Sequence, residues 1–199
     1  IHLKGLSALG ARVEVEHGYV VAEGPHLTGA EIFLGGAFGP TVLGTANVAM
    51  AAVLAEGTTV IEQAACEPEV TDLLEFLVKM GAKISGIGTH HLEIEGVEGL
   101  QGAEHTIIPD RIEAGTLLLA GAVTRGEVTV TGLRSTHLSA VLDKLHDAGI
   151  GVSKTATSVT VHPPRRIQAC QLTTMAYPGF PTDLQAQFMA LLCLADGIS

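Results

Sequence analysis

The apolar positions of the chain follow one pattern that recurs about every seventy residues. In each copy, two leucines lie three positions apart, as on one face of a helix, and a glycine and then a β-branched residue follow. The glycines of this marker are Gly10, Gly81 and Gly149, separated by 71 and 68 positions. We expect each of them to end a helix in the left-handed conformation, directly before a strand.

A second marker repeats with the same period in the other half of the unit. Apolar helices are predicted over 45–54, 114–123 and 184–194, and each is followed by a charged residue and a glycine. These glycines are Gly57, Gly126 and Gly197, separated by 69 and 71 positions. Because two independent markers share one period, we infer an internal repeat of helix, strand, helix and strand.

The repeat predicts an unusual α/β architecture. The helices over 46–54 and 117–123 are apolar nearly all round, which requires burial on most sides. The strand over 91–95 alternates, as does the hairpin of 11–15 with 19–22, which fits sheets with one face in water. We therefore expect the helices to form the interior and the sheets to form the outer wall. The period exceeds the 20–50 residues of solenoids and favours a closed, compact arrangement.

Composition favours a folded protein and disfavours nucleic-acid binding and membrane contact. Of the 199 residues, 47% are hydrophobic and 16% are charged, which favours a folded chain with a sizeable core. The net charge of −10 disfavours non-specific nucleic-acid binding, which depends on Lys and Arg. The longest apolar stretch, 46–55, is about half of the ~20 residues that a membrane helix needs, so no membrane contact is expected.

The cysteines indicate the cellular compartment of the protein, and the two ends of the chain indicate a piece of a longer one. Cys66, Cys170 and Cys193 form no CxxC pair and have no metal-ligand spacing. We expect them to be reduced and buried, consistent with the cytoplasm. No secretory signal opens the chain. The chain begins in an amphipathic segment and stops just after a helical pattern, so we expect it to be cut at both ends.

No nucleotide-binding loop or metal motif is present in the sequence. GxxxxGKS/T, GxGxxG and GxSxG are all missing, and His90 and His91 would lie on opposite faces of a strand. We therefore expect neither a metal nor a cofactor. Three polar segments, 38–45, 109–113 and 177–187, open the three apolar helices. Equivalent helix ends can converge on one cleft, where free N–H groups favour an anion.

Each of these three segments also has a purely structural interpretation. In the first, Thr41 could be an N-cap after a proline turn, or its hydroxyl and the helix end could hold a ligand. In the second, Asp110 and Glu113 have capping-box spacing, which leaves Arg111 in need of an anionic partner. In the third, a cap by Thr182 or Asp183 would leave two glutamines of the apolar helix unexplained.

These segments resemble the UDP-N-acetylglucosamine 1-carboxyvinyltransferase family. The resemblance rests on four strings: TVLGTANVAMAAVLAEGTT at 41–59, EPE at 67–69, PDRIE at 109–113 and FPTDLQAQ at 180–187. It implies the inside-out α/β barrel of the enolpyruvyl transferase fold, with two domains of three similar units each. Residues 1–109 would belong to the first domain, and residues 110–199 would start the second.

The resemblance also implies an activity and its residues. The family transfers the enolpyruvyl group of phosphoenolpyruvate to the 3-hydroxyl of UDP-N-acetylglucosamine, the first committed step of peptidoglycan synthesis. This step supports cell-wall biogenesis, cell shape and cell division. Asp183 matches the acid that takes the hydroxyl proton, and Thr41 and Val42 match positions that hold the nucleotide. Glu67 and Arg111 match cleft residues near the substrate. Ile1 matches the tail of the uracil-binding segment.

The chain departs from the family in two respects. Leu43 stands where the family has a glycine, and the loop with the acid-donating Cys or Asp would precede Ile1. Most phosphate-binding arginines would also lie outside, so we expect these 199 residues to be inactive alone. Two alternatives stay open: the shikimate-pathway enolpyruvyl transferase, and a non-catalytic repeat module that binds a nucleotide sugar or a protein.

Overall fold

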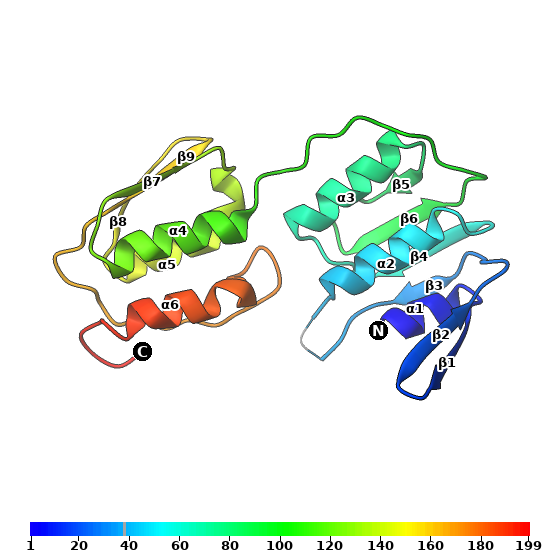
Figure 1. Ribbon diagram of the computed structural model, residues 1–199, viewed down its shortest axis with the longest axis horizontal. Coiled ribbons are helices and arrows are strands. Elements are labelled where there is room, and N and C mark those ends of the chain that lie inside the picture. The colour runs from blue at the N-terminus through cyan, green and yellow to red at the C-terminus, as the bar shows by residue number, and fades with distance from the viewer. Residues whose placement is uncertain (38) are drawn as a thin grey trace. The chain divides into compact units, whose positions relative to one another are not determined.

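The computed structural model describes residues 1–37 and 39–199, so Phe38, which opens the first polar segment, lies outside the described residues. The chain divides into two compact units, Ile1–Ile108 and Pro109–Ser199, each with a hydrophobic core of its own (Figure 1). No helix among the described residues combines the length and the apolar character needed to cross a bilayer.

The first unit packs three helices against one sheet. The helices are α1 (His2–Ala8), α2 (Val42–Ala52) and α3 (Pro68–Lys79). The strands are β1 (Arg12–Glu16), β2 (Tyr19–Glu23), β3 (Glu31–Phe33), β4 (Thr58–Glu62), β5 (Lys83–Ser85) and β6 (His91–Glu95). The sheet has the order β3-β4-β6-β5, with β3 parallel to β4 and the other pairs antiparallel. Strands β1 and β2 form the predicted hairpin.

One face of this sheet is buried and the other is exposed. Along β6, Leu92 and Ile94 are buried in the core, while Glu93 and Glu95 are exposed, as the alternating pattern predicts. The buried side chains of β3 and β4 join the same core, and so does the face of α2 that includes Val48. The helices therefore cover the inner face of the sheet, and the outer face carries the charges.

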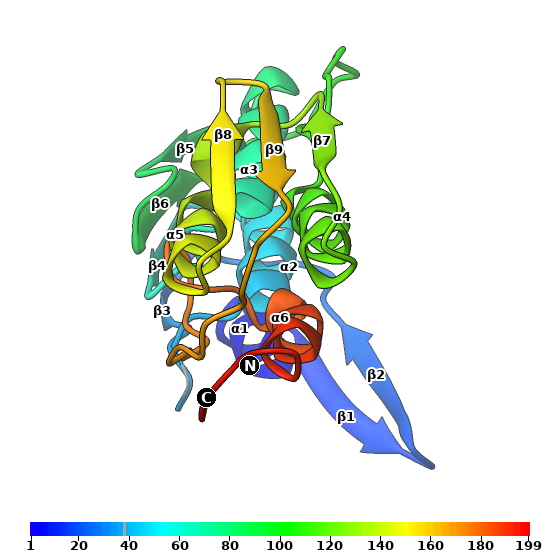
Figure 2. The ribbon, with the colours of Figure 1, turned by 90° about the vertical axis from the view of Figure 1, so that its left-hand side faces the viewer.

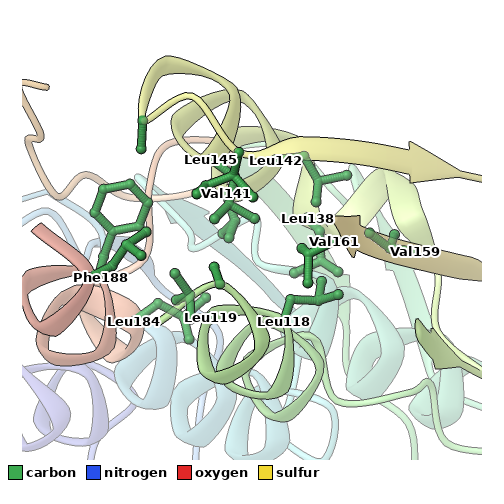
Figure 3. Packing of buried hydrophobic residues seen from close by; sticks show 14 of the residues in the cluster. Leu118, Leu119, Leu138, Val141, Leu142, Leu145, Val159, Val161, Leu184 and Phe188 are labelled. Carbon is green, nitrogen blue, oxygen red and sulfur yellow. The ribbon is translucent and has the colours of Figure 1, made fainter. Parts of the chain in front are cut away.

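The second unit repeats this construction. Its helices are α4 (Arg111–Val123), the 3₁₀ turn η1 (Ser135–Leu138), α5 (Ser139–Asp147), the 3₁₀ turn η2 (Thr182–Leu184) and α6 (Gln185–Leu192). Its strands β7 (Val128–Thr131), β8 (Gly151–Lys154) and β9 (Ser158–His162) form an antiparallel sheet of order β7-β9-β8 (Figure 2). The core joins Leu118 and Leu119 of α4, Val159 and Val161 of β9, and Phe188 of α6 (Figure 3).

The first marker of the repeat is confirmed at all three copies. Gly10, Gly81 and Gly149 have φ of +96°, +108° and +77°, which only glycine adopts without cost. After each glycine, a backbone N–H returns to the carbonyl five residues earlier. These bonds run from Ala11 to Leu6 (3.0 Å), from Ala82 to Leu77 (3.0 Å) and from Ile150 to Leu145 (2.9 Å). Each helix therefore ends in a Schellman motif.

The second marker is less uniform in conformation than the first, and the apolar helices are less buried than the sequence predicts. Gly57 and Gly197 have positive φ, but Arg125 rather than Gly126 takes the left-handed position after α4. Helix α2 is buried except along one stripe that continues past its end, where Leu43, Asn47, Met50 and Leu54 are exposed. The stripe is exposed because the core of the first unit meets the opposite side of α2. The sheets of the described residues are open rather than closed into a barrel.

Candidate functional site

Thr41 is the N-cap of α2, as the structural interpretation of the first polar segment proposed. Its Oγ1 accepts the N–H of Gly44 at 3.4 Å, which is a long and weak hydrogen bond. Its carbonyl accepts two further bonds, from the backbone N–H of Thr45 at 2.9 Å and from the Thr45 hydroxyl at 2.8 Å. The start of α2 is therefore held chiefly through Thr45, while the Thr41 hydroxyl is only lightly engaged.

Thr45 also joins the start of α2 to the loop that leads to Glu67. The Thr45 side chain is fully buried, and its Oγ1 accepts the backbone N–H of Ala65 at 3.0 Å. Two residues later, Glu67 is the N-cap residue of α3 and is only 7% exposed, although its carboxylate does not cap the helix. The Thr45 hydroxyl therefore links the start of α2, with Thr41 and Val42, to the loop that precedes Glu67.

A histidine fixes the other side of the same loop. The Ala64 N–H donates to the His90 carbonyl at 3.0 Å, and His90 Nδ1 donates back to the Ala64 carbonyl at 2.8 Å. His91 instead binds Glu62 at 2.7 Å, so the two histidines have separate partners. In the described part of the chain, no group of three or more His, Cys, Asp or Glu is placed to hold a metal. His90 is thus a structural anchor of the loop before Glu67.

The cysteines are free, but they are not uniformly buried as the sequence predicted. Cys66 and Cys170 are partly buried, and Cys193 is exposed at the end of α6. Burial raises the pKa of the Cys66 thiol, and the negative charge of Glu67 raises it further. Cys66 is therefore a poor nucleophile beside the candidate site.

Ile1 lies against the start of α2. A Cβ added to Gly44 would lie 3.3 Å from Ile1 Cγ2 and 2.4 Å from Thr41 Cγ2, so these three residues are close neighbours. A Cβ on Gly36 would meet Ile1 Cδ1 at 3.2 Å. Leu43, which replaces the glycine of the family, is 68% exposed, so its larger side chain meets solvent and not the core.

In the second unit, Asp110 is the N-cap of α4, as predicted. Its Oδ1 accepts the N–H groups of Ile112 at 2.7 Å and Glu113 at 3.1 Å. The next residue, Arg111, is half-buried and places its guanidinium 5.5 Å from the centre of the Tyr177 ring. This cation–π contact joins the second polar segment to the third, a pairing that the sequence did not indicate.

Helices α4 and α6 run side by side in the same direction. Gly115 makes the close approach possible, since a Cβ there would lie 2.5 Å from Leu184 Cδ1. At the next residue of α4, the Thr116 hydroxyl accepts a hydrogen bond from Gln187 Nε2 of α6 at 3.0 Å. The buried Oε1 of the same glutamine has no hydrogen-bond partner within the described ranges. These two contacts place the end of η2 and the start of α6 beside the second turn of α4.

The capping interpretation of Thr182 and Asp183 is wrong. Pro181 is the N-cap of η2 and Leu184 that of α6, and neither helix start has a side-chain cap. Asp183 is exposed within the 3₁₀ turn, and the next residue, Leu184, packs against Gly115 of α4. Its carboxylate is therefore presented to solvent and is not used to stabilise a helix.

The structure thus gathers the predicted residues into two groups, one in each unit. In the first unit, Ile1, Thr41 and Val42 lie at the start of α2, and Glu67 follows the loop that Thr45 ties to this helix. In the second unit, Arg111 begins α4, and Asp183 precedes the residue that packs against Gly115 of the same helix. A pocket beside α6 is lined by residues such as Gln185, Met189 and Cys193, and none of the predicted site residues lines it.

The whole chain, residues 1–199, matches the family model described as EPSP synthase (3-phosphoshikimate 1-carboxyvinyltransferase). The chain therefore belongs to this family of enolpyruvyl transferases. Among solved structures, it is similar to the enolpyruvyl transferase NikO from Streptomyces tendae, with a TM-score of 0.88 and 24% identity over 99% of this chain and 50% of that one. EPSP synthase from Acinetobacter baumannii matches with a TM-score of 0.63 and 16% identity, over 86% of this chain and 41% of that one. At these identities the likeness shows the mixed α/β fold alone.

Two curated relatives are much closer in sequence. The UDP-N-acetylglucosamine 1-carboxyvinyltransferase of Methylacidiphilum infernorum (isolate V4) is 52% identical over all of this chain and 47% of its own length. The UDP-N-acetylglucosamine 1-carboxyvinyltransferase 1 of Symbiobacterium thermophilum is 53% identical over all of this chain and 44% of its own length. The chain thus spans about half the length of the curated relatives that it matches.

Proposed function

We propose that this chain forms about half of a UDP-N-acetylglucosamine 1-carboxyvinyltransferase. The observation that supports this best is the 52% and 53% identity, over the full chain, to two enzymes of that name. The 3-hydroxyl oxygen of UDP-N-acetylglucosamine would bond to C2 of phosphoenolpyruvate, and inorganic phosphate would leave as the vinyl ether forms. We place this reaction at the first committed step of peptidoglycan synthesis, in the cytoplasm, where it serves cell-wall biogenesis, cell shape and cell division.

Asp183 is our candidate for the group that takes the proton of the attacking hydroxyl. Such a group must come within hydrogen-bond reach of the substrate. Two observations support this role: the carboxylate is exposed in η2, and it caps neither η2 nor α6. Arg111, held over the ring of Tyr177 at the same end of the unit, would supply positive charge for an anionic substrate.

The group in the first unit is our candidate for the nucleotide-binding part of the site. Thr41 and Val42 open α2, where free N–H groups favour an anion such as a diphosphate. Ile1 adjoins them, and Glu67 is tied to the same helix start through Thr45. We propose that each of the two groups contributes to substrate binding or catalysis in the whole enzyme.

We further propose that the open sheets and buried helices of each unit belong to inside-out α/β barrels that the full-length protein completes. Residues 1–109 would then be part of the first domain and residues 110–199 the start of the second. Because the loop acid and most phosphate-binding arginines would come from elsewhere in the full-length protein, the 199 residues alone would not turn over substrate. A coupled phosphate-release assay on the isolated chain tests this, and turnover there would contradict it.

A binding titration of the full-length protein tests the choice of substrate. We expect UDP-N-acetylglucosamine to bind and to raise the melting temperature, as any ligand that binds the native state does. We expect shikimate 3-phosphate to do neither. The reverse result would assign the chain to the shikimate-pathway enzyme, for which the matching family model is described. Binding of the nucleotide sugar without turnover in the presence of phosphoenolpyruvate would instead indicate a non-catalytic module.

A further inference from the structure

The segment that leads from β6 to α4, residues 96–110, has no helix or strand, yet it is held firmly to the first unit (Figure 1). The N–H of Gly96 donates to the Gly57 carbonyl, and the N–H of Gln101 donates to the Met80 carbonyl, both at 2.9 Å. A backbone segment without secondary structure needs such partners wherever it is not fully solvated.

The last anchor is His105, which docks on one face of α3. Its Nε2 lies 3.0 Å from Asp72 Oδ1, its Nδ1 lies 3.0 Å from Lys79 Nζ, and its ring centre lies 5.1 Å from that of Phe76. These three partners are four and three residues apart along α3, which is the spacing of one helix face. An ammonium group can only donate, so Nδ1 accepts from Lys79 and Nε2 donates to Asp72.

Burial separates this contact from the other histidine–carboxylate pairs of the chain. The side chains of His105 and Asp72 are only 8% and 11% exposed. The His91–Glu62 pair has a similar distance, 2.7 Å, but its side chains are 56% and 53% exposed. Exposed pairs contribute little, whereas removal of one partner from a buried pair leaves the other charged or polar group without compensation. Loss of the His105 contact should therefore destabilise the structure more than loss of the His91 contact.

We propose that His105 and Asp72 form a latch that fixes the connecting segment to α3 as far as residue 105. Bending between the two units is then confined to residues 106–109, where Ile107 is 77% exposed and no helix or strand forms. Without the latch, the nearest backbone anchor is Gln101, and the flexible connection grows from four residues to eight. His105 is thus a positioning residue for the segment that carries Asp110 and Arg111.

The latch also bears on the candidate site, in so far as the proposed function holds. Helix α3 begins beside Glu67 and carries Asp72 little more than one turn later. The same helix therefore holds a candidate substrate-binding residue at its start and the connection to Arg111 along its side. A longer, freer connection would position Arg111 less well, which weakens substrate binding without removing a reacting group.

Limited proteolysis of the full-length protein, followed by mass spectrometry, tests the latch without reference to activity. Glu104 is exposed and directly precedes His105, so cleavage after Glu104 by a glutamate-specific protease reports opening of the segment. We expect this cleavage to be about 10-fold faster or more in His105→Ala and in Asp72→Ala, because the segment opens locally. Asp72→Asn keeps the acceptor oxygen and should stay within about 3-fold of the wild type. The matched control is His91→Ala, which breaks the exposed pair and should leave this cleavage unchanged.

Unchanged cleavage after Glu104 in both alanine variants, or the same acceleration in His91→Ala, would overturn the proposal. In steady-state assays we expect His105→Ala to raise the KM for the nucleotide sugar by about 10-fold with a smaller change in kcat, and His105→Gln to restore it in part. Faster cleavage in the two alanine variants, with a wild type that has no activity, would support the latch and contradict only the proposed function.

Discussion

Thr45→Val removes the one hydroxyl that joins the start of α2 to the loop before Glu67. The two side chains have nearly the same shape, so the change leaves packing intact and deletes two hydrogen bonds. The carbonyl of Thr41 keeps the backbone N–H of residue 45, at 2.9 Å, and loses little. The N–H of Ala65, a residue only 3% exposed, is left without an acceptor. A buried donor left unpaired costs about 1–3 kcal/mol, which sets the expected loss of stability.

Hydrogen exchange at the Ala65 amide, measured in the full-length protein, follows this bond directly. A cost of about 1.4 kcal/mol corresponds to a tenfold faster exchange through local opening, so we expect an increase between roughly 5-fold and 100-fold. Thr45→Ser is the matched control, because it keeps the hydroxyl and should preserve most of the protection. The dissociation constant of UDP-N-acetylglucosamine should rise in the valine variant only. Unchanged exchange at Ala65 in Thr45→Val would refute the role given to this hydroxyl.

Three further predictions concern other parts of the chain. Asp183→Ala in the full-length enzyme should lower turnover at least ~100-fold in a phosphate-release assay, and near-normal kinetics would remove this residue from the mechanism. Gly115→Ala places a methyl 2.5 Å from a side chain of η2 and should destabilise the second unit by about 1–3 kcal/mol in denaturant unfolding, whereas Gly99→Ala, which meets nothing within 4 Å, should be nearly neutral. Because burial raises the pKa of the Cys66 thiol, its alkylation should reach half-maximal rate at a higher pH in the native protein than in the denatured protein, and an equal or lower pH would contradict this.

The repeat could be predicted from sequence because its signals are local. Pairs of leucines one helix turn apart, with a glycine behind them, are enough to give a helix that ends in a left-handed residue, and Gly10, Gly81 and Gly149 do so. The cap at Asp110 was predictable for the same reason, since an N-cap and its partner N–H groups lie within three residues.

Contacts between distant segments gave no comparable signal. The Arg111–Tyr177 contact spans 66 residues, and the His105–Asp72 contact spans 33, so neither produces a periodicity. The cap expected at Thr182 or Asp183 was wrong because the chain enters α6 through a 3₁₀ turn, which moves the N-cap position of the helix to Leu184. The left-handed residue after α4 is Arg125, which no feature of the sequence indicated.

The candidate site was predictable in part, and mostly through the resemblance. Residue types and spacing identified three polar helix starts but left a structural and a functional interpretation of each. The structure excludes the capping interpretation of Asp183, whose carboxylate caps no helix, and it shows how Thr45 ties the loop before Glu67 to Thr41. Sequence alone could not supply the second of these findings, because a buried threonine in an apolar helix has no sequence feature that names its partner.

Phosphate release by the full-length protein, with phosphoenolpyruvate and each of two acceptors, is the most direct measurement of the proposed activity. We expect release with UDP-N-acetylglucosamine, its loss in Asp183→Ala, and none with shikimate 3-phosphate. Release with shikimate 3-phosphate alone, or release from neither acceptor by a folded protein, would contradict the proposed function.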